Sequence, residues 1–130
     1  MSSDGPVLDA SAVLAYFRRE TGHEAVRDAL LTGATMSTVN LAEVHGRVAL
    51  TGVDPDAALA RLKVSGLAVE PFLEVDAAAT GGLLASTRAL GLSLADRACI
   101  ALAQRLDRPV LTADRGWRSA SVGVEIQLIR

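Results

Sequence analysis

The sequence contains a single cysteine, Cys99. One cysteine excludes an internal disulfide and a zinc site built from several thiolates, so we expect a reducing, cytoplasmic environment. No apolar run reaches the roughly 18 residues that a membrane span needs, and we expect no membrane contact. The first six residues lack the apolar stretch of a signal peptide. We therefore expect residues 1–5 to be a frayed end.

Aromatic residues and net charge are also scarce. Only Tyr16, Phe17, Phe72 and Trp117 are aromatic, which does not favour a platform that stacks unpaired bases. A net charge of −2 does not by itself indicate nucleic-acid binding. Half of the 130 residues are hydrophobic, mainly alanine, leucine and valine. This composition suits helices packed on a sheet in one domain.

Short apolar runs alternate with segments of helical periodicity along the chain. Strands are expected at residues 7–8, 34–36, 67–72, 110–111 and 124–129. Helices are expected at residues 12–19, 24–31, 39–50, from 54–55 onward, 76–90 with a weak point at Gly81-Gly82, and 95–106. The alternation predicts a single α/β domain over residues 1–130, with a mainly parallel central sheet and helices on both faces.

Four acidic residues stand where strands end or helices begin. Asp9 and Asp114 follow predicted strands, whereas Glu43 and Asp96 lie in the first turns of predicted helices. Ligands of parallel α/β sheets bind beyond the carboxyl ends of the strands, so one crevice can collect all four. Carboxylates drawn together repel one another, and a divalent cation relieves that repulsion. An all-oxygen set suits Mg²⁺ and chemistry on phosphodiesters.

Each acid also has a purely structural interpretation. Asp9 fits a helix N-cap, and Asp114 fits a turn. Asp96 ends the sequence SLAD, which has the spacing of a capping box. Glu43 fits a solvated helix face, or an arrangement in which Asn40 caps the helix and Glu43 reaches back to it. The joint placement of the four acids is what favours a metal site.

Arginines flank the acidic segments. For any one of them a solvated helix face is a sufficient explanation, but together they form a candidate track for phosphates. The candidate phosphate contacts are Arg18, Arg19, Arg47, Arg97, Arg115 and Arg118.

The segments VLDASAVLAYF, STVNLAEV, LSLADRACIALA and VLTADRGW together resemble the PIN-domain nucleases, and within them the VapC toxins of bacterial toxin–antitoxin pairs. The resemblance covers nearly the full length. It implies a three-layer α/β/α sandwich whose acidic cluster binds Mg²⁺ or Mn²⁺. It also implies RNA cleavage by metal-activated water, a homodimer, and a VapB-like antitoxin that blocks the site.

The resemblance assigns roles to individual positions. Asp9, Glu43, Asp96 and Asp114 match the catalytic metal-binding acids, Ser11 and Thr112 match supporting hydroxyls, and Asn40 matches a polar residue beside the site. Many relatives carry a further acid two residues after the last aspartate, where this chain has Gly116. This difference leaves the number of metal ions open.

Functions other than that of a toxin are also considered. A PIN-like RNA-processing nuclease, or a catalytically silent binding module, would share the fold without a toxin role. A phosphatase of the haloacid-dehalogenase type fits poorly, because Ser11 stands where that family has a second aspartate and Lys63 is the only lysine.

The first two helices offer a candidate surface for an antitoxin peptide. Tyr16, Phe17, Leu30 and Leu31 are the residues expected to line it. Core packing is an equally good explanation for these side chains.

Overall fold

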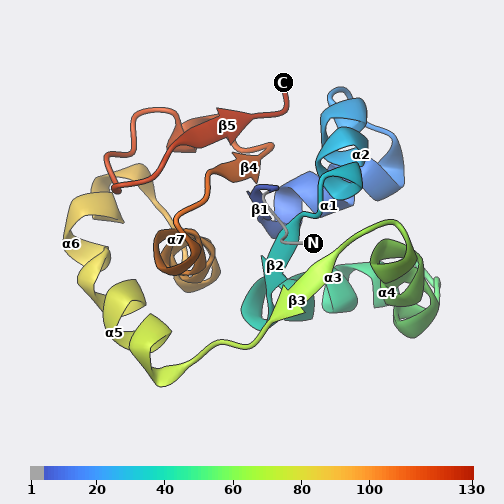
Figure 1. Cartoon of the computed structure of the whole chain (residues 1–130), viewed down its shortest axis with the longest axis horizontal. Coiled ribbons are helices and arrows are strands. Elements are labelled where there is room, and N and C mark those ends of the chain that lie inside the picture. The colour runs from blue at the N-terminus through green and yellow to red at the C-terminus, as the bar shows by residue number, and fades with distance from the viewer. Residues whose placement is uncertain (1–4) are drawn as a thin grey trace.

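The computed structural model describes residues 5–130, which form a five-stranded parallel sheet flanked by helices (Figure 1). The strand order is β3-β2-β1-β4-β5, and every neighbouring pair is parallel. The strands are β1 (Val7–Leu8), β2 (Thr35–Ser37), β3 (Ala68–Glu70), β4 (Val110–Thr112) and β5 (Ile126–Leu128). The prediction of a parallel α/β sheet is confirmed, with β1 at its centre.

Helices connect the strands as the sequence pattern predicts. They are α1 (Ala10–Arg18), α2 (His23–Leu31), α3 (Thr38–Ala49), α4 (Pro55–Val64), α5 (Glu74–Gly82), α6 (Leu84–Thr87) and α7 (Leu94–Leu106), with 3₁₀ turns η1 (Arg88–Leu90) and η2 (Arg115–Trp117). The single helix expected at residues 76–90 is divided into α5, α6 and η1. The division falls directly after Gly81-Gly82, because glycine weakens a helix interior.

Two apolar clusters pack against the sheet. Val7 and Val110 belong to a cluster with α7, while Leu8 and Leu111 belong to a cluster with helices α1 to α4. Successive residues of a strand point to opposite faces, so each short strand contributes to both clusters. Helices therefore cover both faces of the sheet, as predicted for a three-layer sandwich.

Among the helices of residues 5–130, α7 contains the largest number of buried residues. The six consecutive residues from Ala98 to Ala103 are all buried. This confirms the prediction, made from its nearly continuous apolar surface, that this helix is buried. Arg105 near its end bonds to the carboxylate of Asp76 on α5 at 2.8 Å. Burial alone would raise the pKa of Asp76, but the hydrogen bond from Arg105 makes the net shift downward. This ion pair fixes α5 to α7.

The expected frayed end at residues 1–5 is wrong at Gly5. Gly5 is buried, and a side chain there would collide with Thr32 and Gly33. Residues 1–4 lie outside the described residues. The chain is thus packed from Gly5 onward because the segment before β1 lies against the end of α2.

Gly66 gives a direct test of the turn between α4 and β3. Its φ is +122°, and an added Cβ would overlap the carbonyl oxygen of Leu30. Gly52 has a φ of +83° with no neighbour within 4 Å, so it is the matched control. We expect Gly66→Ala to lower the free energy of unfolding by about 2 kcal/mol and Gly52→Ala by about 1 kcal/mol. Equal losses in urea denaturation would contradict this packing.

None of the helices described for residues 5–130 has the length and apolar character needed to cross a bilayer.

Candidate active site

The four predicted acids line one open pocket of about 290 Å³, beside the carboxyl ends of the central strands. Asp9 follows β1, Asp114 follows β4, Glu43 lies in α3 and Asp96 lies in the first turn of α7. Segments that are distant in sequence therefore meet at the edge where parallel sheets bind ligands.

Asp9 is the most buried and the most firmly held of the four. It is 3% exposed. Its carboxylate accepts hydrogen bonds from the Ser11 hydroxyl at 2.8 Å, the Thr112 hydroxyl at 2.6 Å and the backbone N–H of Ala12 at 2.9 Å. The last bond caps α1, so the structural interpretation of Asp9 is also correct. Ser11 and Thr112 hold the carboxylate in a fixed orientation.

The environment of Asp9 opposes its ionisation. Burial raises the pKa of Asp9 to about 6, although the bonds from Thr112, Ala12 and Ser11 act in the opposite direction. The negative charge of Asp96 adds to the rise. Negative charge is therefore concentrated in this pocket.

Glu43 experiences the same field. Burial, followed by the negative charge of Asp96, raises the pKa of Glu43, while Asn40 and Arg47 partly lower it. Asp9 and Glu43 thus both lie close enough to Asp96 to be repelled by it.

Asp96 and Asp114 also serve their own segments. Ser93 and Asp96 form the predicted capping box, in which the Ser93 N–H donates to Asp96 Oδ2 at 2.9 Å. The Gly116 N–H donates to Asp114 Oδ1 at 2.8 Å and caps the turn η2. Each bond uses one oxygen of its carboxylate, and both side chains still line the pocket.

The alternative interpretation in which Asn40 caps the helix is wrong. Helix α3 begins after Ser37, whose hydroxyl accepts the Val39 N–H at 3.1 Å. Asn40 is fully buried, and its Nδ2 donates to the carbonyl of Ala95 at 3.0 Å. Asn40 therefore joins α3 to the start of α7, next to the residues that carry Glu43 and Asp96.

Only some of the predicted arginines reach the acids. Arg18 and Arg47 line the pocket. Arg97 does not, because its guanidinium donates to the carbonyl of Thr80 on α5 at 2.9 Å. The remaining three candidates, Arg19, Arg115 and Arg118, are exposed and do not line this pocket.

Two lining residues were missed from the sequence. Arg130 and Glu20 both line the pocket, and Arg130 bonds to the Glu20 carboxylate at 3.0 Å. Arg130 follows β5, which no acidic motif marks. Its position next to the site becomes visible only through the pairing of β5 with β4.

The donor chemistry of the pocket fits a hydrated hard cation. Within residues 5–130, no group of three or more His, Cys, Asp or Glu side chains is arranged to hold a metal ion. Mg²⁺ retains several waters and is commonly held through one or two carboxylates. The shared negative field and the all-oxygen donors suit that mode of binding better than a complete protein cage.

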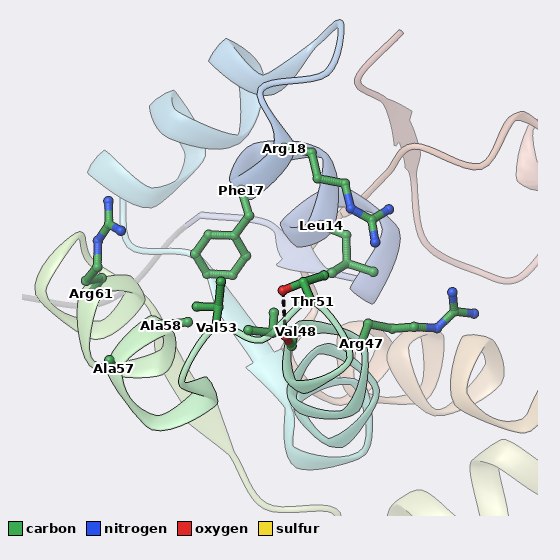
Figure 2. A pocket seen from close by; sticks show the side chains of 10 residues that line it. All are labelled: Leu14, Phe17, Arg18, Arg47, Val48, Thr51, Val53, Ala57, Ala58 and Arg61. Atoms are coloured by element: carbon green, nitrogen blue, oxygen red, sulfur yellow. Dashed lines mark hydrogen bonds between the residues drawn. The ribbon is translucent and has the colours of Figure 1, made fainter.

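An apolar groove of about 380 Å³ adjoins the acids (Figure 2). Arg18 and Arg47 border both cavities. Of the four residues expected to line an antitoxin surface, Phe17 lines this groove, whereas Leu30 is 1% exposed and belongs to the core. The groove lies between α1, α3 and α4, and Leu31 on α2 is exposed.

The PIN domain family matches residues 7–122. This match spans most of the chain, which therefore belongs to the PIN domain family. PIN domains as a class are nucleases that use divalent metal ions. Among curated proteins, none matches the chain at a significant level of similarity.

Solved structures share the fold over nearly their whole length. A toxin–antitoxin complex from Klebsiella pneumoniae is 13% identical with a TM-score of 0.75, covering 97% of this chain and 98% of that chain. VapBC2 from Rickettsia felis, bound to a promoter DNA fragment, is 15% identical with a TM-score of 0.70, covering 94% and 96%. VapBC-5 from Mycobacterium tuberculosis is 23% identical with a TM-score of 0.63, covering 98% of both chains. At these identities the matches establish the fold.

Proposed function

We propose that this PIN domain is a Mg²⁺-dependent endoribonuclease that acts as the toxin of a toxin–antitoxin pair. The observation that carries the proposal is the meeting of Asp9, Glu43, Asp96 and Asp114 in one pocket. The resemblance of its motifs to VapC toxins, and the toxin–antitoxin complexes among its structural neighbours, support the biological role.

Asp9 and Asp96 are the proposed metal ligands, with Glu43 and Asp114 completing the acidic cluster. Mg²⁺, or Mn²⁺ in its place, would supply Lewis acidity and lower the pKa of a bound water. All four side chains offer only oxygen atoms, which both ions accept.

Side chains around the acids are proposed to orient Asp9 and to bind the phosphodiester. The Ser11 and Thr112 hydroxyls donate hydrogen bonds to Asp9 that keep its carboxylate oriented. Arg18, Arg47 and Arg130 bring positive charge to the rim. Guanidinium groups bind phosphate oxygens with two donors, so these arginines are expected to position the RNA backbone.

The antitoxin is proposed to occupy the apolar groove. Leu14, Phe17, Val48 and Val53 give it an apolar lining, and arginines stand at its ends (Figure 2). An amphipathic helix laid in such a groove would cover the approach to the acids.

The expected homodimer also stays a prediction, which sedimentation of the purified chain tests.

The function is tested by incubating antitoxin-free protein with RNA and Mg²⁺. We expect internal cleavage that a chelator abolishes and added Mg²⁺ or Mn²⁺ restores. Expression without the partner gene is expected to arrest growth, whereas normal growth with intact cleavage would indicate an RNA-processing nuclease. Absence of cleavage of any RNA with either ion would contradict the proposal.

A further inference from the structure

A second pocket, of about 250 Å³, carries positive charge outside the acidic site. Its lining residues are Tyr16, Phe17, Arg19, His23, Arg27, Arg61, Leu62 and Ser65. Three guanidinium groups and an imidazole line it, and among residues 5–130 no acidic residue does. This is a local excess of positive charge in a chain whose net charge is −2.

Two of these guanidinium groups are unpaired within the part of the chain that the structure describes. The side chains of Arg19 and Arg61 have no hydrogen-bond acceptor or carboxylate partner anywhere in residues 5–130. Arg27 bonds to the exposed Asp28 at 3.2 Å, in a contact of low net energy. The pocket therefore presents donors that an external anion can satisfy.

The backbone of Arg19 is unusual. It ends α1 with φ 53° and ψ 38°, a left-handed conformation that glycine adopts more easily. An arginine here costs about 1 kcal/mol relative to glycine. The strain is explained if the guanidinium is needed at this place.

The volume of the pocket and the side chains that line it indicate which kind of anion it can bind. Tyr16 and Phe17 are tilted rings with centroids 6.0 Å apart, and both line it. Its volume of about 250 Å³ lies below the usual range for drug-sized ligands, roughly 300–1,000 Å³. A phosphate group with one adjoining ring system fits this combination of guanidiniums and aromatic edges.

We propose that this cationic pocket binds a phosphate group of the RNA strand, away from the bond that is cut. The inference rests on the proposed nuclease function. It adds a second anchoring site, in which Arg19 and Arg61 hold the phosphate and Tyr16 and Phe17 contact the neighbouring base.

The lining of the cavities connects this pocket to the acids. Phe17 and Arg61 line both the cationic pocket and the apolar groove, while Arg18 and Arg47 line both the groove and the acidic pocket. Figure 2 shows Arg61 at one end of the groove and Arg18 and Arg47 at the other. A strand leaving the acids can follow the groove, and a seated antitoxin would block that path.

Comparing a long and a short RNA distinguishes a loss of anchoring from a loss of catalysis. In an inactive Asp96→Asn background, adding Arg19→Gly and Arg61→Ala is expected to weaken binding of an oligoribonucleotide of about 12 nucleotides roughly tenfold. The salt dependence of that binding is expected to become shallower, because fewer counterions are released. In the active enzyme, kcat/KM for the long RNA is expected to fall by a similar factor, while cleavage of a dinucleotide changes less than about twofold.

Arg88→Ala is the control, since it removes one exposed arginine from η1. This turn directly follows α6, which lies across the molecule from α2 in Figure 1. It is expected to leave both RNAs unaffected. Arg19→Gly is expected to melt no earlier than the wild type, which excludes unfolding as the cause. Equal effects on long and short RNA, or no effect on either, would overturn the proposal. So would loss of antitoxin binding alone, or tighter binding of free AMP than of the oligonucleotide.

The two proposals fail in different ways. A wild-type enzyme that cuts no RNA contradicts the nuclease function. A wild-type enzyme that cuts both RNAs, with length-independent effects of the arginine variants, contradicts only the anchoring site.

Discussion

Asp96→Asn is expected to lower the rate of RNA cleavage by about a thousandfold, since it removes a charged ligand at the position that repels both Asp9 and Glu43. Asparagine retains an oxygen that can accept the Ser93 N–H, so the cap of α7 is kept. The measurement is the initial rate of cleavage of a labelled RNA at saturating Mg²⁺.

Glu74→Gln provides the control for this substitution. Glu74 is an exposed acid on α5 and lines neither the acidic nor the cationic pocket. Its replacement is expected to leave the rate within about twofold of the wild type. Cleavage by Asp96→Asn at near the wild-type rate, with the melting temperature unchanged, would remove Asp96 from the catalytic cluster.

Asp9→Asn is expected to abolish cleavage to a similar extent and yet to stabilise the metal-free protein. Burial holds the pKa of Asp9 near 6 instead of 3.8, which corresponds to about 3 kcal/mol against the ionised form. Asparagine fills the same space without a charge. We expect the free energy of unfolding at pH 8 to rise by about 2 kcal/mol. The rise is smaller than about 3 kcal/mol because some hydrogen bonding to Ser11 and Thr112 is lost.

The stability gained through Asp9→Asn is expected to increase with pH. The folded protein binds a proton at Asp9 more tightly than the unfolded chain, so ionisation destabilises the fold as pH rises from about 3.8 through about 6. The difference between variant and wild type is therefore small below pH 4 and complete above about pH 7. Urea denaturation at several pH values in the presence of a chelator measures it. A variant less stable than the wild type at pH 8 would show that Asp9 is held for structure rather than for function.

Much of the fold follows from local patterns in the sequence. Apolar pairs such as Val7–Leu8 predict buried strands, and Asp54-Pro55 predicts the start of α4. The acids could be found for a related reason: Asp9 and Asp114 stand at strand ends, and parallel strands bring their carboxyl ends to one edge.

Other parts of the site depend on tertiary contacts that no local pattern encodes. Arg97 follows Asp96 directly, but one residue along a helix changes its direction by about 100° and sends the guanidinium to Thr80. Arg130 lines the acidic pocket because β5 pairs with β4, and Asn40 bonds to α7 instead of capping α3. Proximity in sequence to an acid was therefore a poor guide to proximity in space.

The aromatic residues show the same limit. Their small number gave no indication of a surface that contacts bases. Tyr16 and Phe17 are adjacent in the sequence, and both nevertheless line the cationic pocket between α1, α2 and α4. The arginines beside them come from three different segments, so only the folded chain brings the group together.

Binding of Mn²⁺ to the antitoxin-free wild-type protein, followed by calorimetry at pH 8, tests the shared acidic pocket most directly. We expect saturable binding to one tight site, at least tenfold weakened in Asp96→Asn and in Asp9→Asn and unchanged in Glu74→Gln. No binding to the wild type, or equal binding to all four proteins, would contradict a cation held between these carboxylates.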